Sequence, residues 1–238
     1  MRIAVFSDVH ANLPALEAVL DFVDGLRVDA TLCLGDLVGY GPHPREVIHL
    51  IRDRQIPCAL GGSDMRVIFP HAGAPKSPET EAALEWTRNQ LGEEERAFLS
   101  SLQPSLRLRT PYGRAKGFHG RPDNPEARFP IYAGEDELLP LIEPLRASII
   151  LTGGGHVPVY RRIARYFILD PGSVGLTLGG EPGADLAVLS VNGDGVRARI
   201  YKIPYDMGQT VFDIKAWGLP ERIAQIVQTG KPQPVGDD

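Results

Sequence analysis

The first quarter of the chain alternates short apolar runs with amphipathic segments, the pattern of parallel strands joined by crossover helices. Residues 3–6, 30–34 and 57–60 are apolar runs of strand length, and helices are expected over 13–23 and 44–54. Consecutive strand-helix-strand units require a parallel arrangement with right-handed crossovers. The chain is therefore predicted to be an α/β protein.

The rest of the chain changes from helical to mainly strand signals. Two further helices are expected over 79–90 and 93–102, and a third over 136–146. Strands are expected over 106–109, 115–119, 149–152, 159–163, 167–169, 186–191 and 196–203. Asn192-Gly193-Asp194-Gly195 separates the last two runs with residues that tolerate positive φ, which predicts an antiparallel hairpin. A helix over 219–227 closes the pattern, so residues 1–230 are interpreted as one domain and 231–238 as a flexible tail.

Composition restricts the classes of partner. The chain has 25 Lys and Arg against 30 Asp and Glu, a net charge of −5, which argues against generic binding to nucleic acid or to anionic membranes. No apolar run approaches the roughly 18 residues of a membrane span. Cys33 and Cys58, the two cysteines, both lie in apolar runs and are read as buried thiols, so a reducing, cytoplasmic location is expected.

Carboxylates and imidazoles follow successive strands. Asp8 and His10 follow the first strand, Asp36 the second, Gly62-Ser63-Asp64 the third, and His119 and His156 two later ones. Residues beyond the carboxyl ends of parallel strands converge on one crevice, and carboxylate with imidazole suits Mn²⁺, Fe²⁺, Zn²⁺, Co²⁺ or Ni²⁺. The alternative is that these aspartates cap helices and turns and that each histidine is a satisfied polar residue at the core edge.

Five segments carry a resemblance to a known family. They are Ser7-Asp8-Val9-His10 with Asn12, Gly35-Asp36-Leu37-Val38-Gly39-Tyr40-Gly41, His119-Gly120, Gly153 to Pro158 and Asp170-Pro171-Gly172-Ser173. In order and spacing the chain resembles the calcineurin-like metallophosphoesterases, in particular their small prokaryotic phosphodiesterase branch, from residue 1 to about residue 230. The resemblance implies a four-layer αββα sandwich of two mixed sheets flanked by helices. It also implies a two-metal centre that activates a water for attack on a phosphate ester.

The resemblance assigns metal ligands residue by residue. One metal would be held by Asp8, His10, Asp36 and His156, and the second would share Asp36 and take His119. The chain departs from the family where Gly62 and Gly154 stand in place of an Asn and a His ligand, and where Ser63 stands in place of the His that steadies the phosphate or protonates the leaving group. We therefore expect one firmly held divalent metal, with Mn²⁺ favoured, and one weak or empty position.

Further candidates surround this set. Asp36, His119 and Asp64 are the candidate catalytic residues. Asp64 is either a substitute carboxylate for the second metal or, as the resemblance implies for this position, a support for the neighbouring residue 63, and His119 is either a metal ligand or a phosphate donor. Asn12 and Arg121 are candidate substrate-binding residues; the alternatives are a helix N-cap for Asn12 and an exposed surface position for Arg121.

The predicted function is hydrolysis of a small phosphate ester, a nucleotide among the candidates, by a metal-activated water. Because Gly62, Ser63 and Gly154 stand in place of functional side chains of the family, a second hypothesis stays open. In it the chain is a weakened or inactive relative that binds a metal, a nucleotide or a protein partner. A structural protein without a metal is the third hypothesis.

Overall fold

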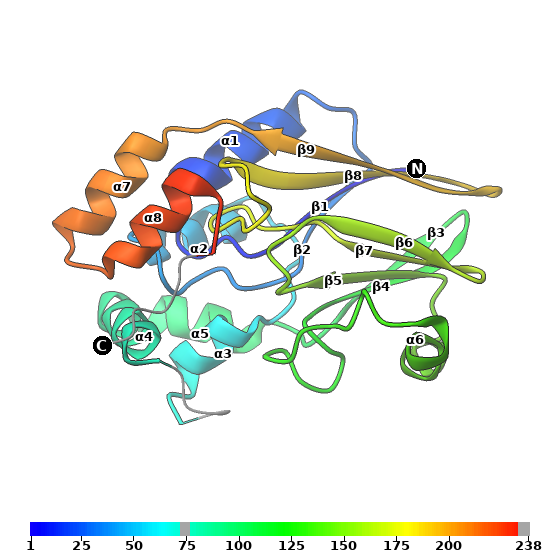
Figure 1. Ribbon diagram of the computed structural model, residues 1–238, viewed down its shortest axis with the longest axis horizontal. Helices are drawn as coiled ribbons and strands as arrows, with labels where there is room; N and C mark the ends of the chain where they lie inside the picture. The colour runs from blue at the N-terminus through cyan, green and yellow to red at the C-terminus, as the bar shows by residue number, and fades with distance from the viewer. Residues whose placement is uncertain (72–76, 233–238) are drawn as a thin grey trace.

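Two mixed β-sheets lie face to face in the computed structural model, which describes residues 1–71 and 77–232 (Figure 1). The first sheet has the order β2 (Ala30–Cys33), β1 (Arg2–Phe6), β8 (Ala184–Asn192) and β9 (Gly195–Ile203). The second has the order β3 (Leu106–Thr110), β4 (Gly113–His119), β5 (Ile149–Gly153), β7 (Tyr166–Asp170) and β6 (Val159–Ile163). β1 runs parallel to β2, and β5 runs parallel to both β4 and β7, so the carboxyl ends of β1, β2, β4 and β5 are available to one site.

Buried side chains divide the protein into layers. Ile3, Val5, Leu151 and Leu169 belong to an apolar cluster between the two sheets. Helices α1 (Leu13–Asp24) and α2 (Pro44–Asp53) pack on the outer face of the first sheet, and α6 (Glu135–Ile142) packs on the outer face of the second. The chain is thus a four-layer αββα sandwich of two mixed sheets flanked by helices, as predicted.

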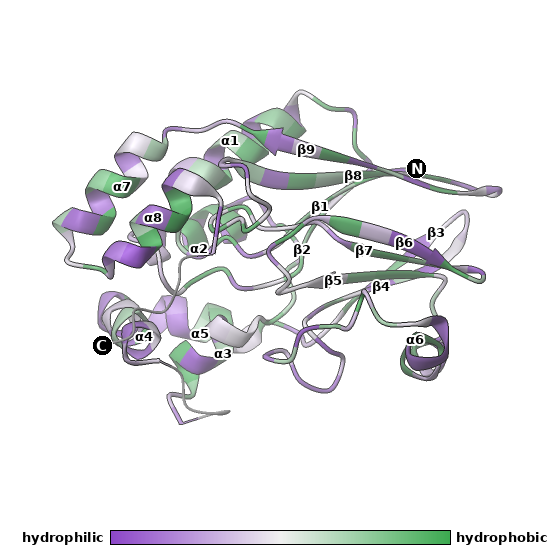
Figure 2. Cartoon of the chain, in the orientation of Figure 1, coloured by the Kyte–Doolittle hydropathy of each residue, from purple (hydrophilic) through white to green (hydrophobic). Residues whose placement is uncertain are grey.

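The remaining helices gather beside one end of the sheets. They are α3 (Gly62–Ile68), α4 (Pro78–Gln90), α5 (Glu93–Ser101), α7 (Met207–Ala216) and α8 (Glu221–Thr229). Helices α7 and α8 alternate between hydrophobic and hydrophilic residues along their length (Figure 2), and their apolar sides share a cluster with Leu176 and with Ala83 of α4. This cluster fixes the C-terminal helices beside the loop that follows β7.

Three details differ from the sequence-based expectations. Residues 57–60 do not form a strand: Cys58 makes one isolated bridge with Cys33 and Ala59 one with Gln103, after which the chain turns into α3. Helices α3 and α7 were not predicted. The 136–146 helix ends at Ile142 and continues as a 3-10 turn, η1 (Glu143–Leu145), since Pro140 and Pro144 cannot donate backbone hydrogen bonds.

Other expectations hold. Strands β8 and β9 form the antiparallel hairpin, with Asn192 Oδ1 accepting from the backbone of Asp194 and Gly195. Both cysteines are buried free thiols. Within residues 1–71 and 77–232, no helix is long and apolar enough to cross a membrane. Most of the proposed flexible tail, residues 233–238, lies outside the described residues.

Candidate metal centre

Two strand-end loops bring the first candidate ligands together. The backbone N–H of Asp8 donates to Gly35 O at 2.9 Å, and that of His10 donates to Asp36 O at 2.9 Å, which joins the loop after β1 to the loop after β2. Gly35 has φ +100°, and a Cβ there would lie 2.8 Å from the backbone nitrogen of Gly61. Only glycine permits this close approach, which also brings the start of α3 beside Asp36.

Four of the five predicted ligands have a left-handed backbone. The φ angles are 56° at Asp8, 48° at His10, 52° at Asp36 and 59° at His156. Such conformations cost on the order of 1 kcal/mol or more at a non-glycine residue and concentrate at functional sites, where surrounding structure holds them. Four residues from three separate loops share this conformation, which indicates that the loops orient their side chains for a function.

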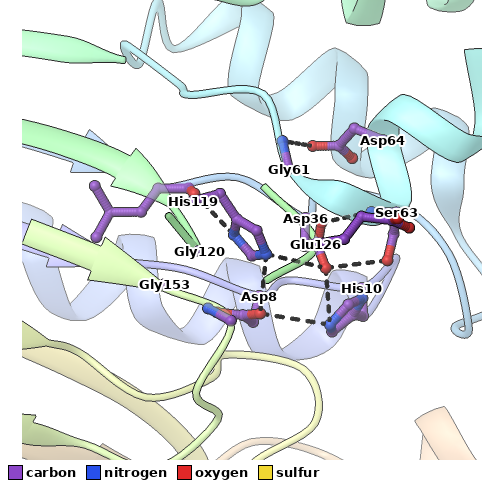
Figure 3. A network of polar contacts seen from close by, with 12 residues as sticks. Asp8, His10, Asp36, Gly61, Ser63, Asp64, His119, Gly120, Glu126 and Gly153 are labelled. Carbon is purple, nitrogen blue, oxygen red and sulfur yellow. Dashed lines mark hydrogen bonds and ion pairs between the residues drawn. The ribbon is translucent and has the colours of Figure 1, made fainter. Parts of the chain in front are cut away.

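The five side chains converge on one small volume, which Figure 3 shows for Asp8, His10, Asp36 and His119. Asp8 Oδ1 lies 3.0 Å from His156 Nε2 and 3.7 Å from His10 Nε2, and the two imidazole Nε2 atoms lie 3.2 Å apart. Asp36 Oδ2 lies 3.4 Å from His119 Nε2 and 3.7 Å from His10 Nε2. Asp8 and Asp36 therefore stand between the two groups of imidazoles.

Each imidazole is oriented through its other nitrogen. The Nδ1 atoms of His156, His119 and His10 lie 2.7, 3.0 and 3.4 Å from the backbone oxygens of Leu176, Leu34 and Val38, respectively. A carbonyl can only accept, so these contacts place the ring proton on Nδ1 and leave the Nε2 lone pair pointing into the site. Backbone carbonyls orient metal-ligating histidines in the same way.

The donor set fits a divalent metal. Ligand atoms about 2.1 Å from a common ion stand roughly 3.0 to 3.5 Å from one another, close to the separations observed here. Asp8 Oδ1 is buried and accepts no hydrogen bond of normal geometry from any described residue, although its Oδ2 accepts from Gly154 N at 3.0 Å. A buried carboxylate oxygen without such a bond is unfavourable unless a cation, either a metal ion or a protonated imidazole, balances its charge. Asp8, His10 and His156 form one possible ligand group, and Asp8, Asp36 and His119 another.

The electrostatics of the ligands reflect the same convergence. Burial alone would raise the pKa of Asp8, but the nearby His156 and His119 imidazoles bring it below the usual range. Burial lowers the pKa of His10 to about 4. For His156, burial opposes the charged form, but the Asp8 carboxylate outweighs it and raises the pKa to about 9. Without a cation, a proton on His156 balances the Asp8 charge, and a metal ion would displace it.

The position of the second metal lacks the side chains that the family uses. A Cβ on Gly62 would have its nearest neighbours at 3.4 Å, in Glu126 and Pro125, and a Cβ on Gly154 would lie 3.2 Å from His119 Nε2. Side chains at both positions would thus be directed toward the side of the centre where His119 lies. Ser63 has become part of the support of Asp36: its N–H and hydroxyl donate to the two carboxylate oxygens at 2.8 and 3.0 Å.

An ion pair borders this part of the centre. Arg66 of α3 is buried, and its guanidinium donates to the carboxylate of Glu126 and contacts Glu81. Both Arg66 and Glu126 line a cavity of about 170 Å³ together with Asp36 and His119. The pair therefore borders this cavity with its charges balanced, on the side where Gly62 and Gly154 lie.

Asp64 and Asn12 are held away from this centre. Asp64 accepts backbone hydrogen bonds from Val38 and Gly61, both at 3.0 Å, which supports the Asp36 loop and caps α3. Burial, together with the Asp36 charge, raises the pKa of Asp64 to about 7. Asn12 is the N-cap of α1 and is 2% exposed. The structure thus gives both residues the supporting roles that were the alternatives to direct contact with metal or substrate.

Arg121 is not the cation that faces the cleft. It forms a bidentate pair with exposed Asp123, at 3.1 Å for each bond, which agrees with the surface position that was the alternative to a substrate contact. Arg128, seven residues further on, lines the 170 Å³ cavity and an adjoining cavity of about 250 Å³ over His10 and His156. It lies in an irregular loop without a flanking motif, which explains why sequence reasoning missed it.

Comparison with known proteins agrees with the fold and the site. A profile of the calcineurin-like phosphoesterase superfamily domain matches residues 1–194. A metallophosphoesterase from Sphaerobacter thermophilus is similar in structure, with 30% identity, a TM-score of 0.80, and coverage of 97% of this chain and 99% of that one. A hypothetical protein from Pyrococcus horikoshii OT3 has the same fold, with 24% identity, a TM-score of 0.85 and coverage of 98% and 99%. An uncharacterised protein of Methanocaldococcus jannaschii is 27% identical over 96% of this chain and 98% of its own length.

The chain therefore belongs to the calcineurin-like phosphoesterase superfamily. At family level it is a metal-dependent phosphoesterase, and its candidate ligand groups are in place.

Proposed function

We propose that this protein hydrolyses a small phosphate ester, a phosphodiester or a nucleotide among them, with Mn²⁺ as the favoured metal. The observation that carries the proposal is the convergence of two carboxylates and three imidazoles whose Nε2 atoms face the carboxylate oxygens while backbone carbonyls hold their Nδ1 atoms. Asp8, His10, Asp36 and His156 would hold one metal, and Asp36 with His119 would be what remains of a second site. When bound, such a metal polarises a phosphoryl oxygen and lowers the pKa of a water.

The residues around the metal centre give the substrate an orientation. Arg128 lines both cavities and has no salt bridge within the described part of the chain, so its guanidinium is available to donate two hydrogen bonds to phosphoryl oxygens. Leu176, Leu178 and Ile223 form an apolar wall of the 250 Å³ cavity. The wall suits the organic group of the ester, which would lie against it while the phosphoryl group faces His10 and His156.

Protonation of the leaving group is the weak step of this arrangement. Ser63 occupies the position of the family's histidine, and its hydroxyl donates to Asp36 Oδ2. A serine hydroxyl near neutral pH is a poor acid, and loss of a positioned acid typically slows hydrolysis by 10²- to 10⁴-fold. Esters with good leaving groups are therefore the proposed substrates, because their departing oxygen needs little protonation.

The replacements at Gly62, Ser63 and Gly154 favour one second candidate, a relative that binds a metal and a phosphate compound without hydrolysing it. One experiment distinguishes hydrolysis from binding without hydrolysis. Purified protein is analysed for metal content and then assayed with bis-p-nitrophenyl phosphate and added Mn²⁺. We expect about one tightly held metal per chain and slow turnover that Mn²⁺ stimulates; a bound metal without turnover would establish the second candidate instead.

Two variants separate true turnover from a contaminant. Asp36→Asn removes the carboxylate charge that the two proposed metal positions would share, and we expect metal affinity and turnover each to fall about a hundredfold. His71→Gln changes an exposed histidine outside the centre and is expected to keep both. Unchanged turnover in Asp36→Asn would refute the assignment of the centre.

A further inference from the structure

A second charged feature lies on the outer face of the β3–β4 hairpin. Both strands alternate: Leu106 and Leu108 of β3, and Ala115 of β4, face the apolar cluster between the sheets. The intervening residues are all cationic and therefore share the opposite face. They are Arg107 and Arg109 of β3 and Arg114 and Lys116 of β4.

The register of the hairpin places like charges opposite each other. Arg107 pairs with Lys116, and Arg109 pairs with Arg114. Cβ atoms of directly opposed residues lie about 5 Å apart, and like charges at that position destabilise a sheet. An anion bound between the opposed cations would attract both of them and offset their mutual repulsion. The arrangement therefore favours binding of an anion on this face.

The face is also hollowed. Helix α6 packs on the outer face of the second sheet (Figure 1), and η1, which follows it, lines a cavity together with β3 and β4. Pro144, Leu145 and Arg146 contribute to this lining, which brings in a fifth cation. The resulting cavity has a volume of about 570 Å³, within the usual range of small-molecule sites. We call these five residues, Arg107, Arg109, Arg114, Lys116 and Arg146, the basic corner.

The basic corner lacks acidic partners. None of its five cations forms a salt bridge with any residue in 1–71 or 77–232, although the chain as a whole carries a net charge of −5. Some surface arginines elsewhere are paired, as Arg52 is with Glu94, Arg54 with Asp24 and Arg121 with Asp123. Around this hollow, by contrast, all five cations lack an acidic partner among the described residues.

We propose that the basic corner binds the phosphate groups of a small polyphosphate, either inorganic or carried by a nucleoside. The four strand cations cover an area of about 5 by 7 Å, enough for two or three linked phosphates but short for a nucleic-acid track. No aromatic residue lines the cavity, so the stacking platform typical of single-stranded nucleic-acid sites is missing. Arg114 and His119 are five residues apart on β4, about 17 Å, so this site is separate from the metal centre.

The test is calorimetric titration of the full-length protein with inorganic tripolyphosphate, in buffer where Mg²⁺ exceeds the probe. The double variant Arg109→Gln, Arg114→Gln removes one opposed pair without changing side-chain length greatly. We expect one probe per chain and an affinity at least about tenfold lower in the variant, because a charge-assisted hydrogen bond contributes about tenfold or more. Arg27→Gln, Arg197→Gln, which removes two exposed cations elsewhere, is expected to bind as the unmodified protein does.

Three results would overturn the proposal. Equal affinity in the corner variant would place the probe elsewhere, including the metal centre. An affinity for sodium sulfate equal to that for tripolyphosphate, measured by the same titration at matched ionic strength, would show charge screening only. Binding of a single-stranded RNA oligonucleotide at the corner, without binding of tripolyphosphate, would identify a macromolecular ligand instead. Because Asp36→Asn disables only the metal centre, persistence of tripolyphosphate binding in that variant separates this proposal from the proposed hydrolysis.

Discussion

Replacing Asn12 by alanine distinguishes a structural role from a substrate contact. The Asn12 Oδ1 atom accepts from Ala15 N at 3.3 Å and from the Thr210 hydroxyl at 3.0 Å. Its Nδ2 group donates to Gly175 O and to the Tyr205 hydroxyl, each at 3.1 Å. One buried amide thus joins the start of α1 to the loop after β7 and to α7.

The size of the effect follows from these contacts. Loss of an asparagine N-cap costs about 1 kcal/mol. Each of the three tertiary hydrogen bonds contributes about 1 kcal/mol, and relaxation around the shortened side chain recovers about 1 kcal/mol of the combined loss. We expect the free energy of unfolding to fall by about 3 kcal/mol. For a chain of 238 residues, whose unfolding entropy is roughly 0.5 kcal/mol per kelvin, that lowers the melting temperature by about 6 °C.

Scanning calorimetry measures the stability, and KM for bis-p-nitrophenyl phosphate measures the substrate contact. Ser77→Ala is the matched control: Ser77 caps α4 through Thr80 N at 3.3 Å on the exposed surface, and its loss is expected to cost only about 1 kcal/mol. KM should stay unchanged in Asn12→Ala at temperatures where the protein is folded. A raised KM with an unchanged melting temperature would refute the reasoning and restore Asn12 as a substrate ligand.

Three further outcomes are expected. Arg128→Met should raise KM about tenfold and leave the metal content unchanged; equal KM values would exclude the guanidinium from phosphate binding. Metal-free protein should lose about 2 kcal/mol of stability between pH 7 and 9. Burial disfavours the His156 imidazolium, but the Asp8 carboxylate outweighs burial and raises the pKa of His156 to about 9, so the stabilisation is complete below pH 6.5 and is lost as pH rises through 9. A melting temperature that does not change over this range would contradict this prediction. Gly62→Asn with Gly154→His should raise the metal stoichiometry above that of the unmodified chain, as elemental analysis would show.

Sequence reasoning reached the fold because the informative signals were local. The apolar run over 3–6 and the turn at 192–195 lie within one strand or one hairpin, and the structure shows both as predicted. The strand expected over 57–60 was wrong because an apolar run of four residues shows strand propensity but not whether neighbours can pair along its whole length. Helix α7 was missed although Asp206 caps it through Gln209 N, an N-cap signal that was present in the sequence.

The site was partly predictable for a similar reason. Asp8, His10 and Asp36 directly follow strands, so topology alone brings them together, and His119 and His156 arrive from the second sheet. Arg128 and Arg66 depend on the path of a loop and the placement of a short helix. No periodicity encodes these features, so their approach to the centre required coordinates.

The asymmetry of the metal centre follows from what fixes each half. Asp8, His10 and His156 have left-handed backbone after strand ends, and backbone groups of Gly154, Val38 and Leu176 contact their side chains, so the fold itself orients this first group. A second metal in the proposed centre would need side chains at the start of α3 and after β5, where this chain has Gly62 and Gly154. Arg66 of α3 lines the same cavity, but Glu126 and Glu81 balance its charge, so it does not replace a missing cation. In the proposed function, activation of a water would therefore rest on the first group of ligands, and binding of phosphoryl oxygens on the guanidinium of Arg128.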